Sequence, residues 1–135
     1  MNYFVTGATG FIGKRLVAKL LARPEATVYF LTRAVEQSHL QDLYEYWGCE
    51  ASRAIPIVGD LTQAELGVSK ADIRKLKGKI EHFFHLAAIY DLKASAEDQQ
   101  RANVDGTRNT VRLAEEIGAG HFHLVSSIAS AGLFE

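Results

Sequence analysis

The sequence contains little cysteine and proline and has no long apolar run. Cys49 is the single cysteine, and only 2 of the 135 residues are prolines. One cysteine cannot form an intrachain disulfide, which is typical of proteins from a reducing compartment. The apolar runs are far shorter than the roughly 20 residues of a membrane helix, and the N-terminus lacks the basic region that begins a signal peptide. We therefore expect a cytoplasmic protein without a membrane span.

An excess of charge of either sign is also missing. The 15 basic and 16 acidic residues give a formal net charge of −1, so the chain has no broad positive field for nucleic acid. The pairs His82/His85 and His121/His123 suggest a metal site. However, residues three apart in a strand point to opposite faces, and no cysteine or carboxylate completes a ligand set at a diagnostic spacing. We expect neither nucleic acid nor a metal ion to be bound, and any bound anion must be held by a local site.

Short apolar runs alternate with helical patterns along the whole chain. Strands are expected at residues 2–6, 27–31, 54–58, 80–87 and 121–125, and helices at 10–23, 40–47, 71–76 and 95–117. Pro24, Gly48 and Gly118 follow three of these helices, and residues of these types end helices. Strands separated by helices predict right-handed crossovers and a parallel sheet covered on both faces. We predict one α/β domain over residues 1–135, with a doubly wound sheet of about five strands.

A glycine-rich turn, Gly7-Ala8-Thr9-Gly10-Phe11-Ile12-Gly13, follows the first expected strand. A pyrophosphate needs backbone N–H donors at a helix N-terminus and a chain that approaches it without side-chain clashes. Gly7 would make the tight turn, Gly10 would admit the phosphate, and Gly13 would let the helix pack on the strand. The spacing differs from the commoner Gly-x-Gly-x-x-Gly, but the position between a strand and a helix argues against an ordinary turn. The pattern predicts a Rossmann-type dinucleotide-binding unit.

The residues after the second and third expected strands indicate which cofactor is bound. An acidic side chain after the second strand selects NAD by accepting hydrogen bonds from the ribose 2′-hydroxyl, but Thr32 and Arg33 stand there instead. The Arg33 guanidinium can bind a 2′-phosphate, which predicts a preference for NADP(H) over NAD. The alternative is that Arg33 begins a solvated loop. Asp60 is expected at the adenine amino group with Leu61 over the ring, unless Asp60 only caps the turn that follows.

Five segments in order resemble the extended branch of the short-chain dehydrogenase/reductase superfamily. They are Thr6–Gly13, Gly59–Leu61, His85–Ala88, Asn103–Thr107 and Val125–Ser127, and they spread over essentially the whole chain. The first is specific, and the other four are persuasive together. Arg33 and the run His85–Asp91 look most like the reductases of fatty acyl and other thioesters. This narrower similarity implies reduction of an activated acyl group or an aldehyde by NADPH, with a small-molecule substrate as the partner.

The resemblance also implies roles for individual residues. Ser127 would be the catalytic hydroxyl that binds the substrate carbonyl, with Ser126 at the nicotinamide end, and the reverse assignment of the two serines stays open. Asn103 would help to hold the active-site backbone or a water. Apart from the resemblance, the position of His85 near the end of the fourth strand predicts a structural hydrogen bond under the cofactor loop. The remaining cofactor contacts would come from Thr9, Phe11, Ile12, Leu86, Ala87 and Ala88.

The sequence departs from the family's pattern at the acid–base pair. The family's chemistry uses a tyrosine with a lysine four residues later, but none of the 5 tyrosines is followed by lysine at that distance. The family also continues past residue 135 with a sixth strand and a substrate-binding part. We therefore expect a truncated unit that binds the cofactor without turnover. Its fifth strand would be an uncovered edge, which favours self-association.

Two other functions fit the same motifs. A sugar-nucleotide epimerase or dehydratase uses the same glycine turn with tightly held NAD. A non-catalytic NADP-binding sensor module would lack the tyrosine–lysine pair, as this chain does. The sequence leaves the identity of the substrate open, because the segments that contact the substrate in this family are expected mostly beyond residue 135. Tyr90 and Asp91 are the only nearby candidates for such contact.

Overall fold

The structure, a computed structural model, describes residues 1–8, 11–32, 40–48, 53–60, 64–86 and 96–124. Its five strands are β1 (Asn2–Thr6), β2 (Thr27–Thr32), β3 (Ala54–Val58), β4 (His82–His85) and β5 (His121–Leu124). The helices are α1 (Phe11–Leu21), α2 (Leu40–Trp47), the short 3₁₀ helix η2 (Ala64–Gly67), α3 (Lys70–Leu76) and α4 (Ala96–Glu116). The predicted order of strands and helices is confirmed, and η2 is the one element that the sequence patterns did not predict.

All five strands are parallel and are hydrogen-bonded in the order β3-β2-β1-β4-β5. The chain moves outward from β1 to β3 and then returns to the other side of β1, so β1 and β4 flank the switch point of the sheet. The register pairs Thr6, the last residue of β1, with His85, the last residue of β4. Gly7 and Leu86 therefore leave the sheet together at its carboxyl edge. The predicted fold class is confirmed as a Rossmann-type α/β fold.

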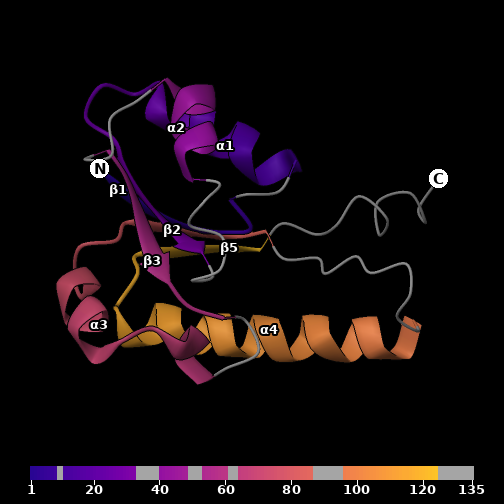
Figure 1. Cartoon of the computed structure of the whole chain (residues 1–135). Coiled ribbons are helices and arrows are strands. Elements are labelled where there is room, and N and C mark those ends of the chain that lie inside the picture. Colours follow the sequence, from indigo (N-terminus) through magenta and orange to yellow (C-terminus); the bar gives the residue numbers. More distant parts are fainter. Residues whose placement is uncertain (9–10, 33–39, 49–52, 61–63, 87–95, 125–135) are drawn as a thin grey trace.

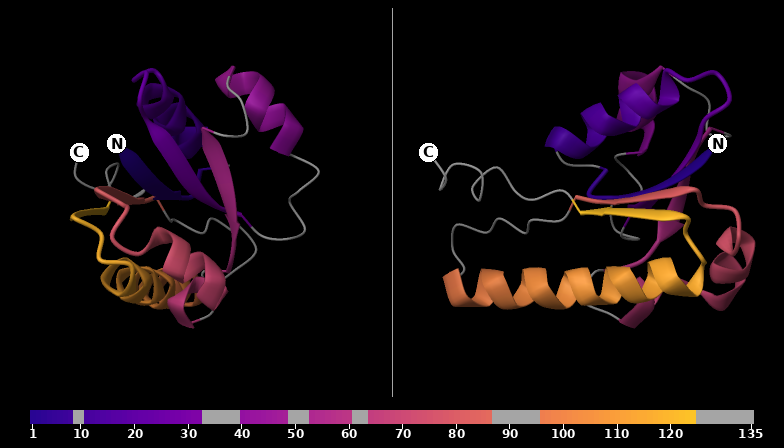
Figure 2. Two further views of the ribbon diagram at one scale, coloured as in Figure 1. Left: turned by 90° about the vertical axis from the view of Figure 1, so that its left-hand side faces the viewer. Right: turned by 180° about the vertical axis from the view of Figure 1, so that it is seen from behind.

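Helices cover both faces of this sheet. Figure 1 and the two views of Figure 2 show α1 and α2 over one face and α3 and α4 over the other. Successive residues of β1 point to opposite faces: Tyr3 and Val5 belong to the core under α1 and α2, whereas Phe4 packs in the core over α4. Because both faces are buried, the strands are near-continuous apolar runs, as is usual for parallel sheets.

The helix ends follow the residues that the sequence marks. Gly48 and Gly118 have φ of +62° and +66°, the left-handed conformation in which a helix commonly ends. Ser69 begins α3, where its Oγ accepts a hydrogen bond of 3.2 Å from the Asp72 amide. The prediction that the first helix reaches residue 23 is wrong by two residues. Arg23 instead closes a tighter turn, its amide donating to the Leu20 carbonyl at 3.2 Å.

Trp47 joins α1 and α2, the two helices on one face of the sheet. Trp47 Nε1 donates a hydrogen bond of 2.9 Å to the Lys14 carbonyl in α1. The Trp47 ring also meets Phe30 of β2 edge to face, with centroids 5.3 Å apart. Trp47 therefore fixes α2 against both α1 and the sheet. Within the described ranges, no helix is both long enough and apolar enough to cross a membrane.

Candidate functional site

The carboxyl end of β1 leads into Gly7, whose backbone is left-handed with a φ of +76°. A side chain here would be strained by that φ. It would also collide, because a Cβ at this position would lie 2.1 Å from the carbonyl oxygen of Leu86. Leu86 directly follows β4, so the turn after β1 packs against the backbone after β4. Gly7 is required both for the turn and for this close approach.

Gly13, in the first turn of α1, makes the second close approach. A Cβ on Gly13 would lie 1.8 Å from the Gly7 carbonyl oxygen and 2.9 Å from the Ala8 Cα. The start of α1 is therefore held against the turn after β1, which is the contact expected of the third glycine in a dinucleotide-binding turn. The first amides of α1 have no carbonyl partner within the helix, and they lie at the carboxyl edge of the sheet. Because side chains at Gly7 and Gly13 would push the start of α1 and the turn apart, these glycines allow an arrangement that fits a pyrophosphate.

A buried polar network ties β1, β4 and α4 together just below the glycine turn. Thr6 Oγ1 and His85 Nδ1 lie 2.6 Å apart, and His85 Nε2 lies 3.2 Å from Thr107 Oγ1 in α4. The Leu86 amide donates to the carbonyl and to Oγ1 of Thr6, at 3.2 and 3.3 Å. His85 is 0% exposed, and burial lowers the pKa of its imidazole to about 4. The imidazole is therefore neutral near pH 7, and each of its ring nitrogens has a hydroxyl partner.

The ends of β2 and β3 meet at the same carboxyl edge. The Gly59 amide donates to the Thr32 carbonyl at 3.0 Å, and the Asp60 amide donates to the Leu66 carbonyl at 2.6 Å. A Cβ on Gly59 would lie 2.5 Å from the Leu66 carbonyl oxygen. The Thr32 side chain is buried and Asp60 is half-buried. The segment after β3 is thus folded closely onto the end of β2, beside the glycine turn.

Three histidines lie on the opposite face of the sheet from His85. His82 stacks on His121 with ring centroids 4.9 Å apart, and its Nδ1 lies 3.0 Å from His123 Nε2. Burial, together with the neighbouring His121, His123 and Arg23, lowers the pKa of His82. Among the residues that the structure describes, no group of three or more histidine, cysteine or acidic side chains is arranged to hold a metal ion.

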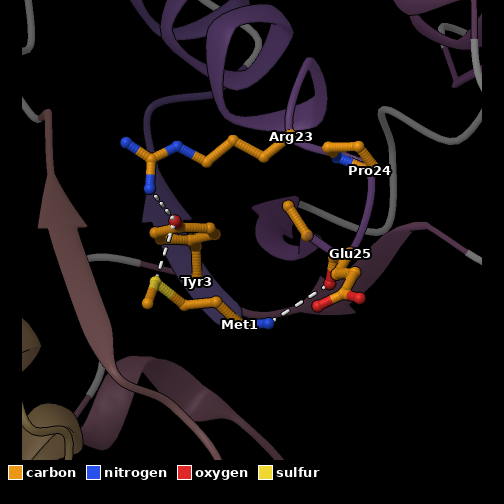
Figure 3. A pocket seen from close by; sticks show the side chains of 6 residues that line it. Met1, Tyr3, Arg23, Pro24 and Glu25 are labelled. Atoms are coloured by element: carbon orange, nitrogen blue, oxygen red, sulfur yellow. Dashed lines mark hydrogen bonds between the residues drawn. The ribbon is translucent and has the colours of Figure 1, made fainter.

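A pocket of about 280 Å³ lies at the other end of the sheet, where β1 and β2 begin. Figure 3 shows the Arg23 guanidinium reaching over the Tyr3 hydroxyl, to which Nη1 donates a hydrogen bond of 3.4 Å. The N-terminal ammonium donates to the Glu25 carbonyl at 3.2 Å on the far side of the pocket. The pocket is far from the carboxyl edge, so it does not belong to the site formed by the glycine turn. Its lining residues are Met1, Tyr3, Arg23, Pro24, Glu25 and Ala26.

Comparison with known families identifies the lineage of this site. The sequence profile of the male sterility protein family, a family of NAD-binding domains, matches residues 5–134. The chain belongs to this family. The resemblance to short-chain reductases of acyl thioesters, which the motifs indicated, is thereby confirmed at the level of the family. The cofactor class of the family is a nicotinamide dinucleotide, in agreement with the geometry of the glycine turn.

The individual relatives include a gramicidin synthase, a fatty acyl-CoA reductase and a terminal R domain of a biosynthetic pathway. The chain is 36% identical to one of the linear gramicidin synthase proteins of Brevibacillus parabrevis, over 92% of this chain and 3% of the synthase. It is 35% identical to fatty acyl-CoA reductase 1 of Xenopus laevis, over 86% of this chain and 25% of the reductase. The terminal R domain of the myxalamid biosynthetic pathway superposes with a TM-score of 0.77 at 31% identity, covering 95% of this chain and 35% of that domain. The chain therefore spans about a third or less of the length of these relatives.

The structure brings together those predicted site residues that it describes. Gly7, Gly13, Thr32, Asp60 and Leu86 all lie at the carboxyl edge of the sheet. For the other predicted site residues, either the whole residue or its side chain lies outside the described part of the chain. These residues are Thr9, Gly10, Phe11, Ile12, Arg33, Leu61, Ala87, Ala88, Asn103, Ser126 and Ser127.

Two polar partners at the site were not predicted from the sequence. The sequence patterns mark Thr6 only as the end of a strand and the start of a family segment, and Thr107 only as the end of another such segment. The expected hydrogen bonding of His85 under the glycine turn is confirmed, with both threonines as its partners. A hydroxyl residue at the end of an apolar strand, directly before a glycine turn, is the signal that could have indicated Thr6.

Proposed function

We propose that this chain is the cofactor-binding part of an NADP(H)-dependent reductase that acts on an acyl thioester or a related carbonyl. The observation that carries the proposal is the close approach of Gly7 and Gly13 to the neighbouring backbone, because it packs the start of α1 against the turn after β1, as in a dinucleotide-binding turn. The similarity to the fatty acyl-CoA reductase from Xenopus laevis supports the substrate class, and the R domain of the myxalamid pathway shares the fold. Because the chain spans only a part of these relatives, the activity of the whole enzyme belongs to the proposal.

The residues of this chain would divide the cofactor between them. The glycine turn with Gly10 would bind the pyrophosphate, Asp60 and Leu61 the adenine, and the segment after β4 the nicotinamide half. When bound, the dinucleotide supplies the hydride that reduces a carbonyl. Ser127 Oγ would donate a hydrogen bond to that carbonyl, and Ser126 would support the nicotinamide end.

The preference for NADP(H) rests on Arg33, which follows β2 where an NAD enzyme has a carboxylate. A guanidinium binds a phosphate with two hydrogen bonds, whereas a carboxylate would repel it. We expect wild-type protein to bind NADPH about 10-fold or more tightly than NADH, and Arg33→Ala to remove most of the difference. Calorimetric titration of both proteins with both dinucleotides measures this. Equal affinities for NADPH and NADH in both proteins would rule out the assignment of Arg33.

The acid–base step needs groups that this sequence does not contain at the family spacing. None of its 5 tyrosines is followed four residues later by a lysine, so no phenol is tuned in that way to deliver the proton. We expect the 135-residue chain to bind NADPH but not to oxidise it in the presence of an acyl-CoA or an aldehyde. An absorbance assay for NADPH oxidation tests this. Oxidation of NADPH above the uncatalysed rate would contradict the expected lack of turnover. It would not contradict the proposed binding of the cofactor.

A further inference from the structure

The buried imidazole of His85 has no part in the chemistry proposed above, yet it lies directly below the glycine turn. Its two ring nitrogens contact hydroxyls from two different elements, Thr6 at the end of β1 and Thr107 in α4. A neutral imidazole carries one donor and one acceptor, so it can connect two hydroxyls, each of which can donate or accept. In either neutral tautomer both ring nitrogens are satisfied. His85 therefore links three elements without placing a charge in the core.

The hydrogen bonds around Thr6 connect this link to the glycine turn. The Thr6 hydroxyl lies 2.6 Å from His85 Nδ1 and also accepts a hydrogen bond of 3.3 Å from the Leu86 amide. The carbonyl of the same Leu86 faces Gly7 so closely that a Cβ on Gly7 would lie 2.1 Å from it. The backbone of Leu86 is therefore held at its amide by Thr6 and contacts Gly7 through its carbonyl. A change at the imidazole would pass through two hydrogen bonds to the backbone of Gly7.

We propose that His85 is a positioning residue for the dinucleotide: it holds the backbone of Leu86 against Gly7 through Thr6, and it anchors both to α4 through Thr107. The inference rests on the proposed function, since it concerns the site that would hold the pyrophosphate. Thr6 passes the effect to the turn, whereas Thr107 only orients the imidazole from behind. Cutting the Thr6 hydrogen bond should thus affect the cofactor more than cutting the Thr107 hydrogen bond.

The test compares two ligands in five variants of the full chain. NADPH contains the pyrophosphate and adenosine 2′-monophosphate does not, so only NADPH reports on the glycine turn. Thr6→Val and Thr107→Val remove one hydroxyl each at almost unchanged volume. His85→Leu removes both polar atoms of the imidazole, and His85→Asn keeps a polar atom near Nδ1 while losing the one at Nε2. The matched control is Thr110→Val. Thr110 is also buried in α4 and donates to the Gly106 carbonyl at 2.7 Å.

We expect Thr6→Val to raise the Kd for NADPH about 10-fold while the Kd for adenosine 2′-monophosphate changes less than about 2-fold. We expect His85→Leu to weaken NADPH in the same selective way, Thr107→Val to weaken it less than Thr6→Val, His85→Asn to keep most of the affinity because it retains a partner for Thr6, and Thr110→Val to keep all of it. An unchanged Kd for NADPH in His85→Leu, equal weakening of both ligands in Thr6→Val, or weakening of NADPH by Thr110→Val to the same extent would overturn the inference. Failure of folded wild-type protein to bind NADPH or NADH would instead remove the proposed function itself.

Discussion

Thr6 and His85, which are 79 residues apart in the sequence, approach within 2.6 Å through Oγ1 and Nδ1. They are also register partners at the carboxyl ends of β1 and β4. These two strands flank the switch point of the sheet, which is where a doubly wound fold binds its ligand. A buried polar contact at this point links the glycine turn after β1 to the segment after β4. Because an imidazole makes this contact, we expect the protein to respond to the protonation of His85.

The first prediction is that the chain loses stability in mild acid because of His85. Burial lowers the pKa of His85 from 6.5 to about 4, so between these values the unfolded chain binds a proton that the folded chain does not. The stabilising contribution is complete above pH 6.5 and is lost as the pH falls toward the folded pKa. At about pH 5 the free energy of unfolding should be about 2 kcal/mol lower than at about pH 7.

Urea unfolding of wild-type protein and His85→Asn at both pH values measures this effect. The asparagine does not titrate, so the variant should lose about 2 kcal/mol less than the wild type over the same interval. Comparing the two proteins removes the contribution of His82, whose pKa is also lowered. The same loss in both proteins would show that His85 does not cause the acid sensitivity.

The second prediction separates close approach from backbone strain at Gly7. Gly7 and Gly78 share a φ of +76°, but a Cβ on Gly7 would meet the Leu86 carbonyl at 2.1 Å, whereas a Cβ on Gly78 would have nothing within 4 Å. Gly78→Ala should therefore cost about 1 kcal/mol of stability, from φ alone. Gly7→Ala should cost about 3 kcal/mol or more, because the backbone after β4 must also move. Thermal or urea unfolding measures the stability of both variants. Similar losses in Gly7→Ala and Gly78→Ala would mean that the turn at Gly7 is loosely packed.

The third prediction concerns the hydrogen bond by which Trp47 links α2 to α1. Trp47→Phe keeps an aromatic ring against Phe30 but removes the hydrogen bond of 2.9 Å from Nε1 to the Lys14 carbonyl. We expect a loss of about 1–2 kcal/mol in the free energy of unfolding. Circular dichroism is the suitable probe, because Trp47 is the single tryptophan and the variant has no tryptophan fluorescence. A variant as stable as the wild type would show that the hydrogen bond is not formed in solution.

The fourth prediction is that the chain self-associates through β5, which lies at one end of the sheet order. Leu124 and Phe122 of this strand are 57% and 36% exposed, and an exposed apolar edge strand is a template for pairing with a second copy. Leu124→Lys should lower the average mass measured by light scattering at high protein concentration. The matched control is Val58→Lys in β3, at the other end of the sheet, where Val58 is 42% exposed. A monomeric wild type, or equal effects of both substitutions, would contradict pairing through β5.

Most of the fold could be predicted because periodicity and helix-ending residues agree along the chain. The apolar run of β1 followed by Gly7 and a helical stripe specifies strand, turn and helix locally. η2 was missed since its four residues are too few to show a period, and Leu66 within it adopts a φ of +59°. Helix α1 was predicted two residues too long, because the pattern continued to the residue before Pro24 and does not distinguish a helical turn from the tighter turn that follows.

The candidate site was predictable in its outline but not in its buried contacts. Gly7 and Gly13 stand out because their spacing reflects the local geometry of one turn. The link from Thr6 through His85 to Thr107 depends on the order of the strands in the sheet. That order brings residues 6 and 85 into register and places α4 beneath them. Single-residue patterns carry no information on such long-range pairs.

The central claim, that the glycine turn holds a nicotinamide dinucleotide, is tested most directly by titrating the folded chain with NADPH and following the nucleotide's fluorescence. We predict saturable binding of one NADPH per chain, displacement by NADP⁺, and much weaker binding by Gly7→Ala at a temperature where circular dichroism shows both proteins folded. Wild-type protein that is folded by the same criterion and yet shows no saturable binding of NADPH or NADH would contradict the claim.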